Sequence, residues 1–93
     1  MKKPSKRDIY REGENLGGWP CDQGPDGKME SNGSVERLMY YEGSYYFVYT
    51  GFFDGPVYRV HKLSDREVLE SILQEDGLVG ELILQHHRAR ARA

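Results

Sequence analysis

Cys21 and His61 are a pair of residue types that could carry out covalent catalysis. A cysteine thiolate is a nucleophile when a histidine acts as its base, but it also needs a pocket that stabilises the thiolate and a third group that orients the base. The sequence indicates neither feature. Cys21 is also the only cysteine, so we expect an inert thiol without an internal disulfide. No enzymatic activity is predicted.

Three other motifs resemble cofactor sites only in part. His86 and His87 are adjacent, so on a helix they would point about 100° apart and not form the i, i+4 pair that binds zinc. Asp22–Gly27 has some of the spacing of a calcium loop, but Gly33 stands where a bidentate glutamate is needed. Gly13–Gly18 is glycine-rich but lacks the Gly-Lys-Ser/Thr ending of a phosphate-binding loop. We expect no metal and no cofactor.

Aromatic and cationic side chains between residues 35 and 63 are stronger candidates for function. This stretch holds six of the seven tyrosines and all three phenylalanines. Tyrosine and arginine are favoured where one protein docks on another, and aromatic rings between cations can also stack unpaired nucleic-acid bases. A tryptophan in a glycine-rich segment either anchors that segment or contacts a partner. The candidate partner-binding residues are Arg37, Tyr41, Tyr46, Arg59, His61 and Trp19.

These candidates lie on runs of aromatic and β-branched residues that predict strands. The three predicted strands are Val35–Tyr41, Ser44–Thr50 and Val57–Lys62. Glu42-Gly43 predicts a two-residue hairpin turn, because glycine readily takes a positive φ. This turn pairs Tyr40 with Tyr45. It also pairs Leu38 with Phe47. A second, longer turn is predicted over residues 51–56.

Alternation along the strands assigns their side chains to two faces. The first face is nearly all apolar and is interpreted as the core; it holds Leu38, Tyr40, Tyr45, Phe47, Tyr49, Tyr58 and Val60. The second face mixes aromatics with cations; it holds Arg37, Met39, Tyr41, Tyr46, Val48, Val57, Arg59 and His61. In this register Arg59 neighbours Val48, and Tyr46 neighbours His61. The second face is expected either to be covered by the N-terminal segment or to be presented to a partner.

A helix is predicted after the strands. Ser64 and Glu67 form the Ser-x-x-Glu pattern of a capping box, which predicts a helix from about Asp65 to Glu75 that ends at Gly77. Its apolar stripe is expected to pack on the Phe47 face and consists of Val68, Leu69, Ile72 and Leu73. Residues 78–88 fit either a second helix or a short strand. The helix is preferred, although a glycine at position 80 weakens it.

Length and composition predict one domain with four segments. Residues 1–11 are expected to be a flexible basic N-terminus, residues 12–34 a glycine-rich loop, residues 35–85 the core domain and residues 86–93 a flexible basic tail. A short edge strand around Lys28–Glu30 is an open alternative. We therefore predict a small α+β domain. It has an antiparallel sheet of three strands, or of four if the edge strand forms, with one or two C-terminal helices packed on one face.

The charge distribution narrows the class of partner. Residues 12–85 carry five cations against fourteen carboxylates, whereas the two ends are basic. A nucleic-acid-binding domain should itself be basic, so this pattern is not typical of one. No run of about 18 apolar residues could span a membrane, and the basic start lacks the apolar region of a secretory signal. With the lone cysteine, these features predict a soluble, cytoplasmic protein that does not contact membranes.

The predicted function is that of a non-enzymatic protein-binding module. It would act as an inhibitor or adaptor that docks on a larger protein or complex, as phage-borne inhibitors of host machinery do. Two alternatives remain open. The aromatic and basic face could bind single-stranded nucleic acid, or the acidic body could mimic nucleic acid and block a protein that binds it.

Overall fold

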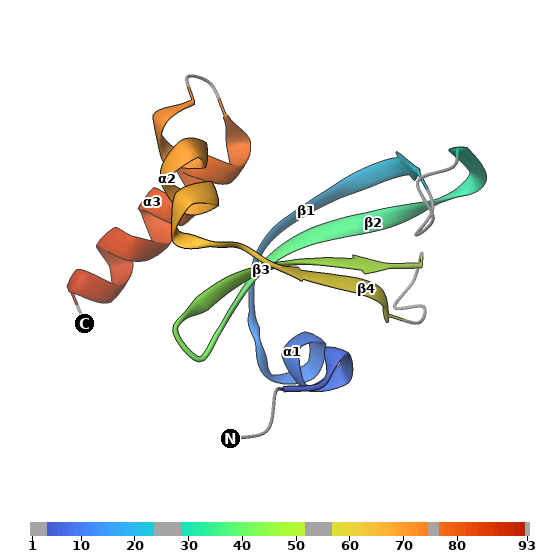
Figure 1. The fold of residues 1–93 in the computed structure, drawn as a ribbon, viewed down its shortest axis with the longest axis horizontal. Coiled ribbons are helices and arrows are strands. Elements are labelled where there is room, and N and C mark those ends of the chain that lie inside the picture. The colour runs from blue at the N-terminus through green and yellow to red at the C-terminus, as the bar shows by residue number, and fades with distance from the viewer. Residues whose placement is uncertain (1–3, 24–28, 52–56, 75–76, 93) are drawn as a thin grey trace. The chain divides into compact units, whose positions relative to one another are not determined.

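The computed structural model describes four stretches of the chain, residues 4–23, 29–51, 57–74 and 77–92. They form an α+β fold with a four-stranded antiparallel sheet and C-terminal helices, which confirms the predicted fold class (Figure 1). The chain divides into two compact units, residues 1–62 and residues 63–93. Residues 24–27, from the segment that resembles a calcium loop only in part, and residues 52–56 of the predicted second turn lie outside the described residues.

The sheet unit is an antiparallel meander whose strands neighbour each other in chain order (Figure 1). Its strands are β1 (Glu14–Gln23), β2 (Met29–Tyr41), β3 (Ser44–Thr50) and β4 (Val57–Lys62). Strand β1 and the start of β2 occupy most of the segment that was predicted to be a loop, so that prediction is wrong. Glycine suits position 18 of β1, because a Cβ there would lie only 3.2 Å from the Cγ of Arg37 in the neighbouring strand. Pro20 is tolerated because β1 is an edge strand.

The hairpin between β2 and β3 forms as predicted. Glu42 has a φ of 46° and Gly43 a φ of 88°, and two positive φ angles are the signature of a tight turn that matches the twist of the strands. Its register places Tyr40 opposite Tyr45, and it also places Leu38 opposite Phe47. The local turn signal therefore predicted correctly which side chains of residues 35–41 and 44–50 share a face.

Strand β4 contains a β-bulge that alternation did not predict. Val57 pairs with Thr50, as the predicted register requires, but the register then shifts at Tyr58, the extra residue. A bulge adds one residue to a strand and moves every later side chain to the other face. The predicted faces are therefore wrong for most of β4, whose observed pairs are Tyr49–Arg59, Val48–Val60, Phe47–His61 and Tyr46–Lys62.

The main buried cluster of the sheet unit involves helix α1 (Lys6–Glu12). This helix begins at a capping box, in which Ser5 accepts a hydrogen bond from the Asp8 backbone, so the prediction of a flexible N-terminus is wrong over this range. The cluster consists of Ile9, Met39, Tyr46 and Val48. The sequence had assigned its three strand residues to the second face, with cover by the N-terminal segment as one of two alternatives, and α1 provides that cover. Of the residues that were expected in the core, Leu38 and Tyr45 are buried, whereas Phe47 is only half-buried.

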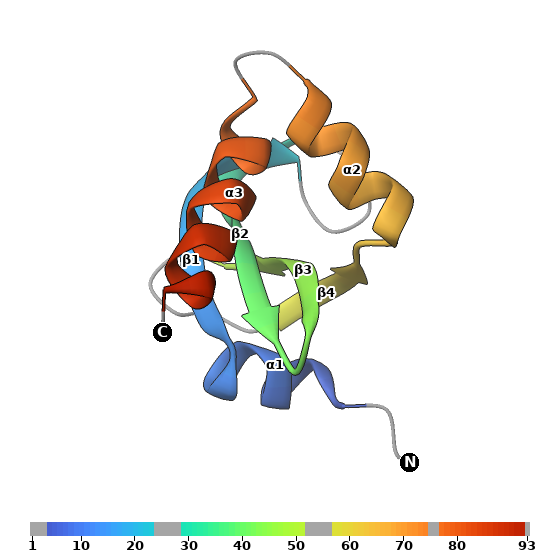
Figure 2. The same cartoon turned by 90° about the vertical axis from the view of Figure 1, so that its left-hand side faces the viewer.

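The C-terminal unit is a pair of helices, α2 (Asp65–Leu73) and α3 (Leu78–Ala91), which lie side by side (Figures 1 and 2). Residues 78–88, for which both a helix and a strand were considered, belong to helix α3. This helix continues through most of the predicted flexible tail. Within α2, Leu69 and Leu73 are exposed and only the other two residues of the stripe are half-buried. Packing of that stripe on the Phe47 face stays a prediction.

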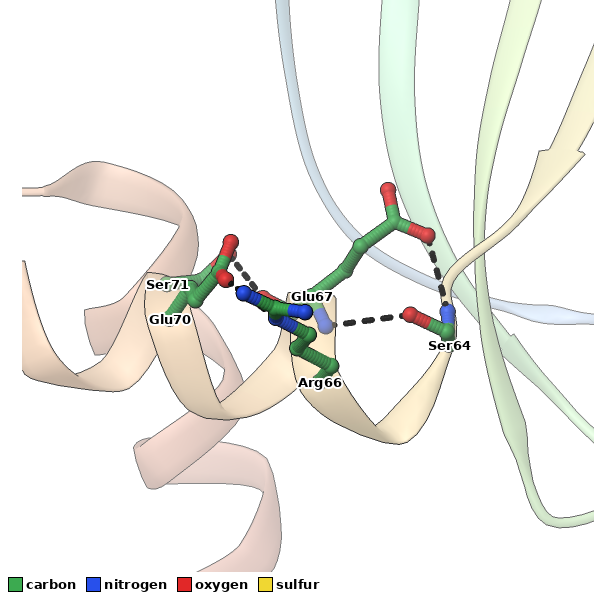
Figure 3. A network of polar contacts seen from close by, with 5 residues as sticks. All are labelled: Ser64, Arg66, Glu67, Glu70 and Ser71. Atoms are coloured by element: carbon green, nitrogen blue, oxygen red, sulfur yellow. Dashed lines mark hydrogen bonds and ion pairs between the residues drawn. The ribbon is translucent and has the colours of Figure 1, made fainter.

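The capping box of α2 forms as the sequence indicates. Ser64 Oγ accepts a hydrogen bond from the Glu67 backbone N–H at 3.1 Å, and Glu67 Oε1 accepts one from the Ser64 N–H at 3.0 Å (Figure 3). In the same helix, Arg66 and Glu70 form an exposed i, i+4 ion pair. The two reciprocal bonds satisfy backbone donors that the first turn of a helix otherwise leaves without a partner.

Replacing Ser64 with alanine is expected to destabilise α2 by about 0.5–2 kcal/mol, because one backbone donor loses its acceptor. Chemical denaturation followed by circular dichroism at the helical band measures this loss. Ser64→Asp is the matched control, since an aspartate keeps a side-chain acceptor at the cap and should retain most of the stability. Equal midpoints for the alanine variant and the parent would contradict the prediction.

Candidate functional site

The six candidate residues divide between the two faces of the sheet. Directly paired residues on neighbouring strands share a face. Trp19 lies opposite Glu36, and Arg59 and His61 lie opposite Tyr49 and Phe47, so these three candidates share one face. The other three, Arg37, Tyr41 and Tyr46, lie on the face that α1 covers. The predicted site is thus not brought together as a whole.

The candidates on the α1 face make internal contacts. Tyr46 is only 8% exposed. The Arg37 guanidinium donates a hydrogen bond to the buried Thr50 hydroxyl and lies 5.4 Å from the centre of the Tyr10 ring. The Tyr41 hydroxyl donates to a Glu12 carboxylate oxygen at 3.2 Å. Desolvation and this hydrogen bond raise the pKa of Tyr41 to about 12, so its hydroxyl stays protonated at neutral pH. These contacts join α1 and its end to the sheet.

The other face carries a row of four residues, one from each strand. Trp19, Glu36, Tyr49 and Arg59 lie opposite one another in succession, and we call them the Trp19 row. The Trp19 indole N–H donates to Glu36 Oε1 at 2.7 Å. The Arg59 guanidinium carbon lies 4.4 Å above the centre of the Tyr49 ring, at a distance typical of a cation–π contact. Each member of the row is therefore held by a neighbour.

Glu36 and Arg59 set the electrostatics of the Trp19 row. Burial raises the pKa of Tyr49, and a hydrogen bond with Glu36 raises it further, while the charge of Arg59 opposes the rise. Tyr49 is therefore a neutral phenol that can donate to the Glu36 carboxylate. The row places one carboxylate near its centre and one guanidinium at its β4 end, so its formal charges balance.

A second set of rings lies beside the Trp19 row. Phe47 stacks on His61 with their ring centres 6.4 Å apart and their planes at 14°. The Trp19 ring meets the edge of Phe47, also at 6.4 Å and at 77°. Phe47 and Trp19 are half-buried, whereas His61 and Arg59 are exposed. We call the set Trp19, Phe47, Tyr49, Arg59 and His61 the aromatic face.

Sequence reasoning missed Glu36, Phe47 and Tyr49 as parts of this site. Phe47 and Tyr49 were assigned to the core. The one available signal was Glu36, because alternation places its carboxylate on the same face as Leu38 and Tyr40, where it needs a polar partner. The Trp19 indole N–H is that partner.

The histidines of the catalytic and zinc motifs lie among the described residues. His61 belongs to the aromatic face, and His86 is buried in α3 while His87 is exposed. Within the described stretches, no three His, Cys, Asp or Glu side chains are grouped as a metal ion would require. Among the helices of these stretches, none is long and apolar enough to cross a membrane.

The fold thus defines a small α+β protein built on an antiparallel four-stranded meander, with aromatic rings and the Arg59 guanidinium on one face. Comparisons of the chain with protein-family models, with curated proteins and with solved structures found no match.

Proposed function

We propose that this chain is a protein-binding module, an inhibitor or adaptor, that docks its aromatic face on a larger protein. The observation that carries the proposal is the Trp19 row. Tryptophan, tyrosine and arginine are the residues most enriched at the energetic centres of protein interfaces. Here Trp19, Tyr49 and Arg59 lie in one row across strands β1, β3 and β4 of one sheet, within reach of one partner surface.

Order within the aromatic face supports this function. A side chain that is mobile before binding loses rotamer freedom on binding, and that loss weakens the complex. Trp19 is held by Glu36 and Phe47, and Arg59 is held over Tyr49. These residues are therefore ordered in advance. The exposed His61 can supply part of the polar rim that surrounds the apolar centre of most interfaces.

Single-stranded nucleic acid is the second candidate partner. The stacked pair of Phe47 and His61 and the guanidinium of Arg59 favour it, because bases stack on aromatic rings while cations bind phosphates. Glu36 argues against it, since its carboxylate lies between Trp19 and Tyr49 and repels phosphate. A protein partner can instead present a donor to this carboxylate. We therefore favour protein.

Replacing Arg59 with alanine is expected to weaken binding to the partner by about thirty-fold or more, the size of effect at an interface hot spot. A partner captured on the parent protein is identified, and its affinity for each variant is measured by calorimetry. Lys62→Ala is the matched control. It removes a cation from the same strand, but Lys62 lies on the opposite face, so its affinity should match the parent's.

The salt dependence of the same measurement separates the two partner classes. Affinity for nucleic acid should fall steeply between about 50 and 200 mM salt, whereas an aromatic protein interface should change little. A steep fall would favour the nucleic-acid alternative. Equal losses for Arg59→Ala and Lys62→Ala, or no loss for either, would exclude the aromatic face as the docking surface.

A further inference from the structure

A pocket lies within the sheet unit, on the face opposite the aromatic face. Its volume is about 320 Å³, and it is lined by Pro4, Lys6, Ile9, Tyr46, Val60 and Lys62. The lining comes from the start of the chain, from α1 and from strands β3 and β4. None of the lining residues belongs to the aromatic face, so the pocket and the proposed docking surface are independent.

The lining residues divide by burial into an apolar floor and a cationic mouth. Ile9 and Tyr46 are 3% and 8% exposed, and Val60 is half-buried beside them. Lys6 and Lys62 are both exposed. Lysine covers apolar surface with its methylene chain and keeps its ammonium in water, so the two ammonium groups belong at the mouth. No lining residue carries a carboxylate.

From this arrangement we propose that the pocket binds a small amphipathic monocarboxylate, with its apolar body on the Ile9 and Tyr46 floor and its carboxylate between Lys6 and Lys62. Ligand pockets are typically apolar cavities in which a few polar groups fix the ligand's orientation. Two cations at the mouth of an apolar floor complement a ligand that is negative at one end only. A neutral molecule of the same shape lacks the charge attraction to the ammonium groups, and a cationic one is repelled by them.

Pocket volume limits the size of the ligand. Ligand sites span about 300–1,000 Å³, so this pocket is at the small end of the range. A water molecule occupies about 30 Å³ in the liquid, and the pocket therefore has room for about ten non-hydrogen atoms. Octanoate is of this size and serves as the probe. Its neutral isostere octanamide has the same body without the charge.

A titration of the full chain with octanoate, followed by amide NMR shifts, tests the proposal. Saturable shifts are expected at Ile9, Tyr46 and Val60, with at least about tenfold weaker binding of octanamide. Lys62→Gln should weaken octanoate binding by about tenfold or more, the loss expected for one charge-assisted contact. Lys6→Gln should do the same.

Arg66→Gln is the control variant, because Arg66 is an exposed cation on α2 and does not line the pocket. Its affinity for octanoate should equal that of the parent protein. The proposal is overturned if octanamide binds as tightly as octanoate, or if the Lys62 variant binds octanoate unchanged. It is also overturned if the shifts map to residues away from the pocket, or if no saturable shifts occur at millimolar octanoate.

Discussion

Replacing Tyr46 with alanine is expected to cost the sheet unit about 3–5 kcal/mol, a large part of the roughly 5–15 kcal/mol that stabilises a small domain. Tyr46 is 8% exposed and packs in one cluster with Ile9, Met39 and Val48. Truncation removes the whole ring from a cluster whose other members come from α1, β2 and β3, so a cavity remains. Equilibrium denaturation of the full chain, followed by amide exchange in the strands, measures the loss.

Two further variants make this result specific. Tyr46→Phe keeps the ring and should retain most of the stability. Phe47→Ala removes a ring of similar size from the next residue of the same strand, but Phe47 is only half-buried, so its loss should be smaller. A larger loss for Phe47→Ala than for Tyr46→Ala would mean that the main core lies on the aromatic face, as strand alternation predicted from the sequence.

Local signals in the sequence predicted local structure correctly. Glu42-Gly43 and Ser64-x-x-Glu67 each act within a few residues, and both the hairpin turn and the helix cap form as expected. The register of β2 on β3 follows from the turn alone, because a two-residue loop leaves one way to pair the strands. The α+β fold class follows from the same signals.

Long-range effects account for the errors. Strand β1 is rich in glycine and has a weak local preference for strand, but pairing with β2 overrides it. The bulge at Tyr58 has no signature in the sequence, and it moves Arg59 and His61 away from Tyr46 and onto the face of Trp19. Arg59 and His61 therefore share a face with Trp19 because of this bulge, which alternation alone could not predict. Helix α1 then covers the other half of the predicted site.

Gly80, in the C-terminal unit, is a second case in which a long-range contact outweighs a local sequence preference. Its helix propensity argued weakly against a helix at this position. The structure supplies the reason for a glycine here: α3 crosses α2 so closely at Gly80 that a Cβ would overlap the Ser71 carbonyl group, 2.7 Å from its carbon, and would lie 3.1 Å from the Ile72 Cα. A residue that disfavours an isolated helix thus permits two helices to pack.

Replacing Gly80 with alanine is therefore expected to destabilise the C-terminal unit by about 2 kcal/mol, although the same change in an isolated helix would gain about 1 kcal/mol. Overpacking typically costs about 1–3 kcal/mol and more where the clash is with backbone, which cannot rotate away. Amide hydrogen exchange should show lost protection in α2 and α3 while the sheet strands keep theirs. Gly77→Ser is the matched control, because a Cβ there meets its nearest atom at an ordinary 3.4 Å and serine caps helices well. If the amides of α2 and α3 are as well protected from exchange in the Gly80→Ala variant as in the parent protein, the two helices do not cross at this glycine.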